Sequence, residues 1–111
     1  GSKVLVLGAA YKPDIDDLRE SPAIDVIRLL EQKGAVISYY DPYIPVIKEE
    51  GWEIKSITDV MAGVREDDCV VIVTNHKCFD YAQILKESHL ILDTRNAFGK
   101  MGIKDPKVVR L

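Results

Sequence analysis

The sequence lacks the glycine-rich turn with which a standard dinucleotide-binding domain holds a pyrophosphate. The apolar run Val4–Leu7 predicts a buried strand that stops at Gly8. Such a domain would continue with the pattern G-x-G-x-x-G and enter a helix at once. Here Ala10 stands in place of the second glycine and Pro13 in place of the third. This strand end is therefore not expected to form the close backbone cradle of that site.

The sequence also lacks an excess of positive charge and long apolar runs, and it has few cysteines. The chain has 15 Lys and Arg against 18 Asp and Glu, a formal net charge of −3, whereas nucleic-acid-binding domains usually present a basic face. No apolar run approaches the ~20 residues of a membrane-spanning helix. The only cysteines are Cys69 and Cys78, and neither a secretory leader nor an Asn-x-Ser/Thr acceptor is found. We expect a cytoplasmic protein that binds neither nucleic acid nor membrane.

Strand and helix patterns alternate along the 111 residues, of which 47% are hydrophobic, enough for one domain with a core. Strands are expected at Lys3–Leu7, Ala35–Tyr40, Cys69–Thr74, His89–Asp93 and Lys107–Leu111. Helices are expected at Pro22–Lys33, Pro45–Glu50, Thr58–Val64 and Phe79–Lys86, and Trp52–Ser56 is expected to be irregular or briefly extended. This order is typical of a parallel sheet covered by helices on both faces.

The first predicted helix has clear end signals. Ser21 is a suitable N-cap, Pro22 suits the first helical position, and Gly34 suits the position just after the last turn.

The loops that follow the strands are expected to meet at one edge of the sheet, because the carboxyl ends of parallel strands share an edge. They are Gly8–Glu20, Asp41–Pro45, Thr74–Cys78 and Asp93–Phe98. In open α/β sheets ligands bind at this edge. The four loops therefore predict one site.

Tyr11, Lys12 and Arg19 in the first loop suggest an anionic ligand. A lysine supplies a compact positive charge, and an arginine can bind a phosphate or carboxylate through two parallel hydrogen bonds. The alternative for Arg19 is structural, since a pair with Asp16 or Asp17 would only shape the loop. The residue types alone leave both interpretations open.

Arg95 and Asn96 follow a buried strand directly. They would face the loop of Tyr11 and Lys12 if the first and fourth strands were neighbours. Asp93 has a structural alternative as the cap of a turn.

Asp41 stands where a dinucleotide-binding domain places the acid that holds a ribose. Because the glycine pattern is missing, we favour the alternative in which Asp-Pro opens a turn. His76, Cys78 and His89 do not have the spacing of a metal site. A nucleophilic role for Cys78 beside His76 is disfavoured, because the sequence supplies no third group to orient the pair.

Four segments together resemble the C-terminal domain of UDP-glucose/GDP-mannose dehydrogenases. They are Gly8–Pro22, with the sequence GAAYKPDIDDLRESP, Tyr40–Tyr43, Val71–Thr74 and the Asp93–Asn96 turn, DTRN. Gly51–Ser56 and Asn75-His76 further resemble the UDP-N-acetylglucosamine 6-dehydrogenase branch.

The resemblance implies an α/β fold, a Rossmann-like three-layer sandwich with a mainly parallel sheet. Residues 1–111 would form a single C-terminal sugar-nucleotide-binding domain, excised from a larger dehydrogenase. The full-length protein would be an NAD-dependent UDP-sugar 6-dehydrogenase, with a homodimeric assembly, that oxidises the C6 alcohol to a carboxylate. A missing N-terminal domain would bind most of the NAD and a missing central region would carry the nucleophilic cysteine. The fragment alone would be inactive.

The resemblance also assigns residue roles. Tyr11, Lys12, Arg95 and Asn96 would bind the UDP-sugar, and Arg19 would reach toward the NAD. No catalytic residue and no metal ligand is expected in this chain. The alternative from another class of protein is a stand-alone nucleotide-binding or regulatory module without catalysis.

Overall fold

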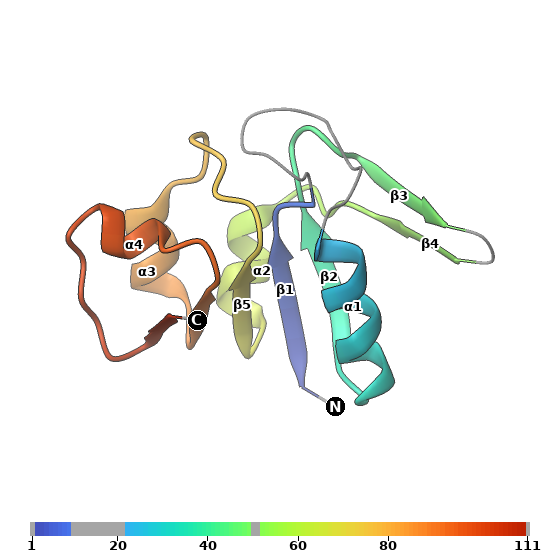
Figure 1. The fold of residues 1–111 in the computed structure, drawn as a ribbon, viewed down its shortest axis with the longest axis horizontal. Coiled ribbons are helices and arrows are strands. Elements are labelled where there is room, and N and C mark those ends of the chain that lie inside the picture. Colours follow the sequence, from blue (N-terminus) through green and yellow to red (C-terminus); the bar gives the residue numbers. More distant parts are fainter. Residues whose placement is uncertain (1, 10–21, 50–51, 111) are drawn as a thin grey trace.

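Five parallel strands form the central sheet of the computed structural model, which describes residues 2–9, 22–49 and 52–110 (Figure 1). In chain order they are β1 (Lys3–Leu7), β2 (Val36–Tyr40), β5 (Cys69–Ile72), β6 (Ile91–Asp93) and β7 (Val108–Arg110). In space the order is β2-β1-β5-β6-β7. Every neighbouring pair is parallel, so all five carboxyl ends lie at the same edge. The predicted sheet is confirmed.

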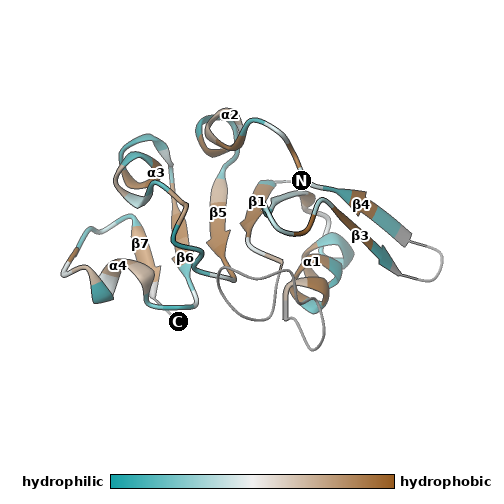
Figure 2. Cartoon of the chain, turned by 90° about the horizontal axis from the view of Figure 1, so that it is seen from above, coloured by the Kyte–Doolittle hydropathy of each residue, from teal (hydrophilic) through white to brown (hydrophobic). Residues whose placement is uncertain are grey.

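Helices cover both faces of this sheet (Figure 2). Helix α1 (Pro22–Gln32) lies on one face, where Ile27 packs with Val4, Val6 and Val71. The opposite face carries α2 (Val60–Glu66), α3 (Tyr81–Glu87) and the short α4 (Ala97–Lys100). Successive residues of a strand point to opposite faces of the sheet. On β1, Val4 and Val6 are buried on the face of α1, and Leu5 and Leu7 are buried on the opposite face. The three-layer α/β sandwich is therefore confirmed.

A β-hairpin replaces one expected helix. The segment predicted as a helix over Pro45–Glu50 forms β3 (Val46–Glu49), which pairs antiparallel with β4 (Trp52–Lys55). The prediction was wrong because β-branched Val and Ile favour a strand, and Ile47 enters the core of the α1 face opposite Ile54. The hairpin extends beyond α1 and β2 at the upper right of Figure 1.

Several element ends differ from the expectation. Asp59 caps α2, because its carboxylate accepts the Ala62 N–H at 3.1 Å, so this helix begins at Val60 rather than at Thr58. Asp80 caps α3 through the Gln83 N–H at 3.1 Å, so this helix begins two residues after Phe79. Helix α4 was not predicted.

Gly34 follows α1 with a φ of 90°, as its predicted stop position requires. Ser21, the predicted cap at the other end of this helix, lies outside the described residues. Within the described ranges no helix is long and apolar enough to cross a membrane.

Candidate functional site at the carboxyl edge of the sheet

The carboxyl edge brings together residues at the ends of four strands. Ala9 follows β1, Asp41 follows β2, His76 lies in the loop after β5, and Asp93 ends β6. The four predicted loops therefore begin at one edge of the sheet. The condition stated for Arg95 and Asn96 is not met: β1 and β6 are not neighbours, because β5 lies between them. Arg95 and Asn96 are consequently two strands away from β1.

Asp41 and His76 form a buried pair at this edge. The His76 Nε2 lies 2.8 Å from Asp41 Oδ2, and both side chains are fully buried. The same oxygen accepts the Ala9 N–H at 2.6 Å. The Asp41 Oδ1 accepts the N–H groups of Tyr43 at 2.8 Å and Ile44 at 3.2 Å. The turn interpretation of Asp41 is confirmed, and its second oxygen links the ends of β1, β2 and β5.

The geometry assigns the proton on His76. Since the Asp41 carboxylate receives backbone N–H donors, Nε2 must also donate to it rather than accept. The imidazole lies between the rings of Tyr43, at a centroid distance of 4.8 Å, and Phe79, at 5.4 Å. The Tyr81 hydroxyl donates to the His76 carbonyl at 2.7 Å. These contacts hold His76 in one orientation.

Gly8 is packed against the start of the loop that follows β5. A Cβ added at Gly8 would lie 2.6 Å from Thr74 N and 2.7 Å from Thr74 O, and Gly8 has a φ of 92°. Glycine is required here by this close approach and by the backbone conformation. The space beside Gly8 is therefore filled by Thr74.

Asp93 organises the turn after β6. Its buried carboxylate accepts the N–H groups of Arg95 at 3.1 Å, Ala97 at 3.0 Å and Phe98 at 3.0 Å. The structural alternative for Asp93 is thus confirmed, since its carboxylate caps the turn that leads into α4. It also determines how the chain passes through Arg95.

Arg95 and Asn96 lie within this turn. Arg95 is partly buried, and Asn96 has the left-handed φ of 57°. The Asn96 side chain lies over Gly99, where an added Cβ would be 2.7 Å from Asn96 Cγ. Asn96 therefore supports α4, and the substrate roles of both residues remain predictions.

Two tyrosines near the edge have raised pKa values. Burial raises the pKa of Tyr39 to about 12, with a smaller contribution from the Asp41 charge, and its hydroxyl donates to the Ile44 carbonyl at 2.8 Å. Burial also raises the pKa of Tyr40, aided by Cys78 and Asp41. Both tyrosines are therefore neutral hydrogen-bond donors at neutral pH.

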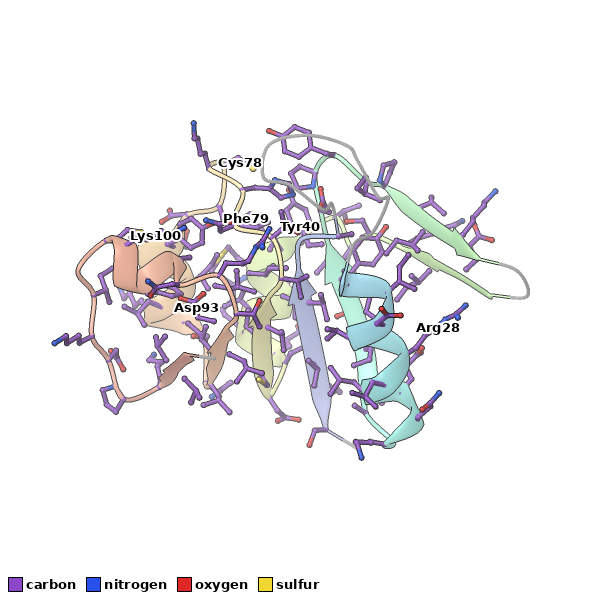
Figure 3. The ribbon with its side chains drawn as sticks, in the orientation of Figure 1. Arg28, Tyr40, Cys78, Phe79, Asp93 and Lys100 are labelled. Carbon is purple, nitrogen blue, oxygen red and sulfur yellow. The ribbon has the colours of Figure 1, made fainter. Side chains whose placement is uncertain are left out.

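The two cysteines have different surroundings. Cys69 is partly buried in β5, and burial followed by the Asp68 charge raises the pKa of its thiol. Cys78 is exposed and lies with Tyr40 and Phe79 along a pocket of about 240 Å³ between α2 and α3 (Figure 3). The His76 Nε2 is hydrogen-bonded to Asp41 Oδ2, a carboxylate oxygen rather than a thiol.

The other predicted binding residues, Tyr11, Lys12 and Arg19, lie outside the described residues. In the part of the chain that the structure describes, no three His, Cys, Asp or Glu side chains are arranged to hold a metal ion.

Sequence reasoning missed the pairing of Asp41 with His76. The available signal was that both residues lie in loops that follow predicted parallel strands; the strand order that places β2 and β5 on either side of β1 comes from the structure. An acid and a histidine at such positions can meet across the intervening strand.

Residues 5–100 match the family described as the UDP-glucose/GDP-mannose dehydrogenase family, UDP binding domain. The chain belongs to this family. It is 35% identical over 105 residues to UDP-glucose 6-dehydrogenase of Bacillus subtilis, which covers 88% of this chain and 23% of that protein. It is 30% identical over 102 residues to UDP-N-acetyl-D-mannosamine dehydrogenase of Methanococcus maripaludis, covering 85% of this chain and 22% of that one.

Solved structures of dehydrogenases contain the same fold. The UDP-N-acetyl-mannosamine dehydrogenase from Staphylococcus aureus aligns with a TM-score of 0.70 and 29% identity, over 99% of this chain and 26% of that one. A UDP-D-ManNAc dehydrogenase from Pyrococcus horikoshii aligns with a TM-score of 0.72 and 26% identity, over 98% and 25%. The chain spans about a quarter of the dehydrogenases it matches. The predicted membership of the family is confirmed, while the UDP-N-acetylglucosamine branch remains a prediction.

Proposed function

We propose that this chain is the sugar-nucleotide-binding domain of an NAD-dependent UDP-sugar 6-dehydrogenase. The observation that carries the proposal is the family match over residues 5–100, together with relatives named as UDP-sugar dehydrogenases. A binding domain that closes an active site contributes by positioning the substrate and by stabilising its charge.

The proposed substrate contacts come from two loops at the carboxyl edge. Tyr11 and Lys12 bind the sugar nucleotide from the loop after β1, and Arg95 and Asn96 bind it from the turn after β6. Lys12 supplies a point charge for the diphosphate, and Arg95 supplies a planar guanidinium. The arrangement of Asp93 supports this role for Arg95, because three backbone N–H groups hold the turn in place.

NAD would be held mainly by another part of the dehydrogenase. The absence of the second and third glycines of the dinucleotide pattern, where Ala10 and Pro13 stand, supports this division. Oxidation of an alcohol to a carboxylate removes two hydride equivalents, which two NAD molecules accept. Within this chain, Arg19 is the residue proposed to reach the cofactor.

The remaining proposals concern the whole protein. Residues 1–111 form one domain of a longer, cytoplasmic, homodimeric chain, and the catalytic cysteine lies in another region. The fraction of each relative that this chain covers supports the part of the proposal that makes it one domain of a longer chain.

The test compares the full-length dehydrogenase with the 111-residue chain. Each is incubated with NAD and with UDP-glucose, UDP-N-acetylglucosamine or UDP-N-acetylmannosamine, and the absorbance of NADH is followed. We expect turnover of at least one UDP-sugar by the full-length protein and none by the 111-residue chain. Sustained turnover by the chain alone would contradict the proposal that NAD binding and the catalytic cysteine belong to other parts of the protein. No turnover by the full-length protein would favour a regulatory nucleotide-binding module.

A further inference from the structure

We propose that the pocket between α2 and α3 is a further binding site, which takes a small, neutral, planar ring with hydrogen-bonding groups on its edge. The base of a nucleoside and a nicotinamide share this chemistry. The described residues that line the pocket come from the end of β2, from α2 and from the segment that leads into α3. The site is therefore separate from the turn after β6, where Arg95 and Asn96 are proposed to bind the sugar nucleotide.

The pocket has room for one ring. Its volume is about 240 Å³, whereas sites for drug-sized ligands measure about 300–1,000 Å³. The rings of Tyr40 and Phe79 meet in its wall at a centroid distance of 6.1 Å, with their planes 49° apart (Figure 3). The other apolar side chains of the wall are Pro42, Val60, Met61 and Ile84. Aromatic faces in an apolar wall favour a planar ring, which can stack on them.

The charge at the pocket disfavours a phosphate. Among the described residues that line it there is no lysine or arginine, and Asp80 is the acidic one. The Asp80 carboxylate is exposed and would repel an anion. The pocket therefore suits a neutral ring, unlike the diphosphate for which Lys12 is proposed.

Two polar side chains of the wall can bind the edge of such a ring. Burial and the nearby Cys78 raise the pKa of the Tyr40 hydroxyl, which is thus a neutral donor, and it makes no hydrogen bond to the described residues. The Gln83 side-chain amide makes none to them either, and it offers both a donor and an acceptor. A few polar groups in an apolar pocket are what orients a small ligand.

The Cys78 thiol can report whether the pocket is occupied. It is exposed and lines the pocket, so a bound ring should shield it from iodoacetamide. Cys69 is the internal control, because it lies in β5 and not along the pocket. The 111-residue chain is alkylated with and without uridine, nicotinamide or uridine monophosphate, and peptide mass spectrometry gives the rate at each cysteine. The assay requires no turnover, so this inference and the proposed function can fail separately.

We expect about 10 mM uridine or nicotinamide to slow the alkylation of Cys78 at least about threefold, since a single ring binds in about the millimolar range. The rate at Cys69 should not change. The compound that protects more strongly identifies the source of the ring, a nucleoside or the cofactor. Uridine monophosphate should protect no better than uridine. The inference is overturned by no protection, by equal protection of both cysteines, or by stronger protection from the phosphate.

Two variants test the polar contacts. Tyr40→Phe keeps the ring and removes only the hydroxyl, and Gln83→Ala removes an exposed amide. Each should raise the uridine concentration that halves the Cys78 rate at least about threefold, as the loss of one hydrogen bond does. Gln32→Ala is the matched control, because Gln32 is also exposed but ends α1 on the other face of the sheet, and it should behave like the parent. Circular dichroism shows which variants are folded. If Tyr40→Phe is not, Gln83→Ala decides alone, and unchanged protection in a folded variant would overturn the inference.

Discussion

Gly8 lies directly against the backbone of Thr74, where β1 and β5 end side by side. An added Cβ would be 2.6 Å from Thr74 N and 2.7 Å from Thr74 O. Val73 and Thr74 both donate their N–H groups to the Leu7 carbonyl, at 2.9 and 3.2 Å, so neither backbone can move aside easily. This close approach joins the two loops that begin the candidate site.

Gly8→Ala should therefore destabilise the domain by at least about 2 kcal/mol, from left-handed backbone strain and the clash with Thr74. Gly34→Ala is the matched control, since Gly34 has a φ of 90° but no atom within 4 Å of an added Cβ. It should cost only about 1 kcal/mol of backbone strain. Urea unfolding of both variants measures the difference, and equal losses would contradict the importance of the contact.

Asp93→Asn should destabilise the turn after β6. The carboxylate accepts three backbone N–H groups while fully buried, and an amide has only one acceptor oxygen. We expect a loss of about 1–3 kcal/mol in the free energy of unfolding. Asp105→Asn serves as the control, because Asp105 is only partly buried and its side chain accepts the Lys107 N–H. A smaller loss for Asp93→Asn than for the control would refute the assignment.

The two thiols should react at different rates. Because burial and the Asp68 charge raise the pKa of Cys69, little of it is thiolate at pH 8, and the thiolate is the nucleophile. Exposed Cys78 should be alkylated by iodoacetamide at least about tenfold faster. Peptide mass spectrometry measures both rates, and Cys78→Ser should leave only the slow reaction. Faster modification of Cys69 would be inconsistent with the structure.

The sheet could be predicted because its pattern is local. The near-continuous apolar runs around Val4–Leu7 and Val70–Val73 are what a strand buried on both faces requires. The hairpin was missed because its short segments have no such run. The β-branched Val46 and Ile47 favour a strand, but the choice also depends on the burial of Ile47 and Ile54 against the core of the α1 face.

The candidate site was only partly predictable for the same reason. The roles of Asp41 and Asp93 as turn caps follow from their position after a strand, and both are confirmed. The link from Asp41 to His76 crosses 35 residues of sequence and depends on the order of the strands. The sequence pattern does not determine that order, so whether the first and fourth strands are neighbours was left as a condition.

Arg19→Lys separates a cofactor role from a structural one. The change keeps the positive charge but removes the planar guanidinium, which can bind through two hydrogen bonds. If Arg19 serves the cofactor, the full-length variant should melt near the parent temperature and bind NAD more weakly in a calorimetric titration. If Arg19 instead pairs with Asp16 or Asp17, NAD affinity should be unchanged, since a surface ion pair contributes only about 0–1 kcal/mol to stability.

The most direct test of the central claim is the kinetics of Lys12→Ala in the full-length dehydrogenase. The claim is that this domain binds the anionic sugar nucleotide, and loss of a charge-assisted contact should cost about 1.5–3 kcal/mol of binding. The measurement compares the Michaelis constants for UDP-sugar and for NAD in the variant and the parent. We predict a rise of at least about tenfold for the UDP-sugar, with little change for NAD. A rise for NAD alone would contradict the account, because the loop would then serve the cofactor.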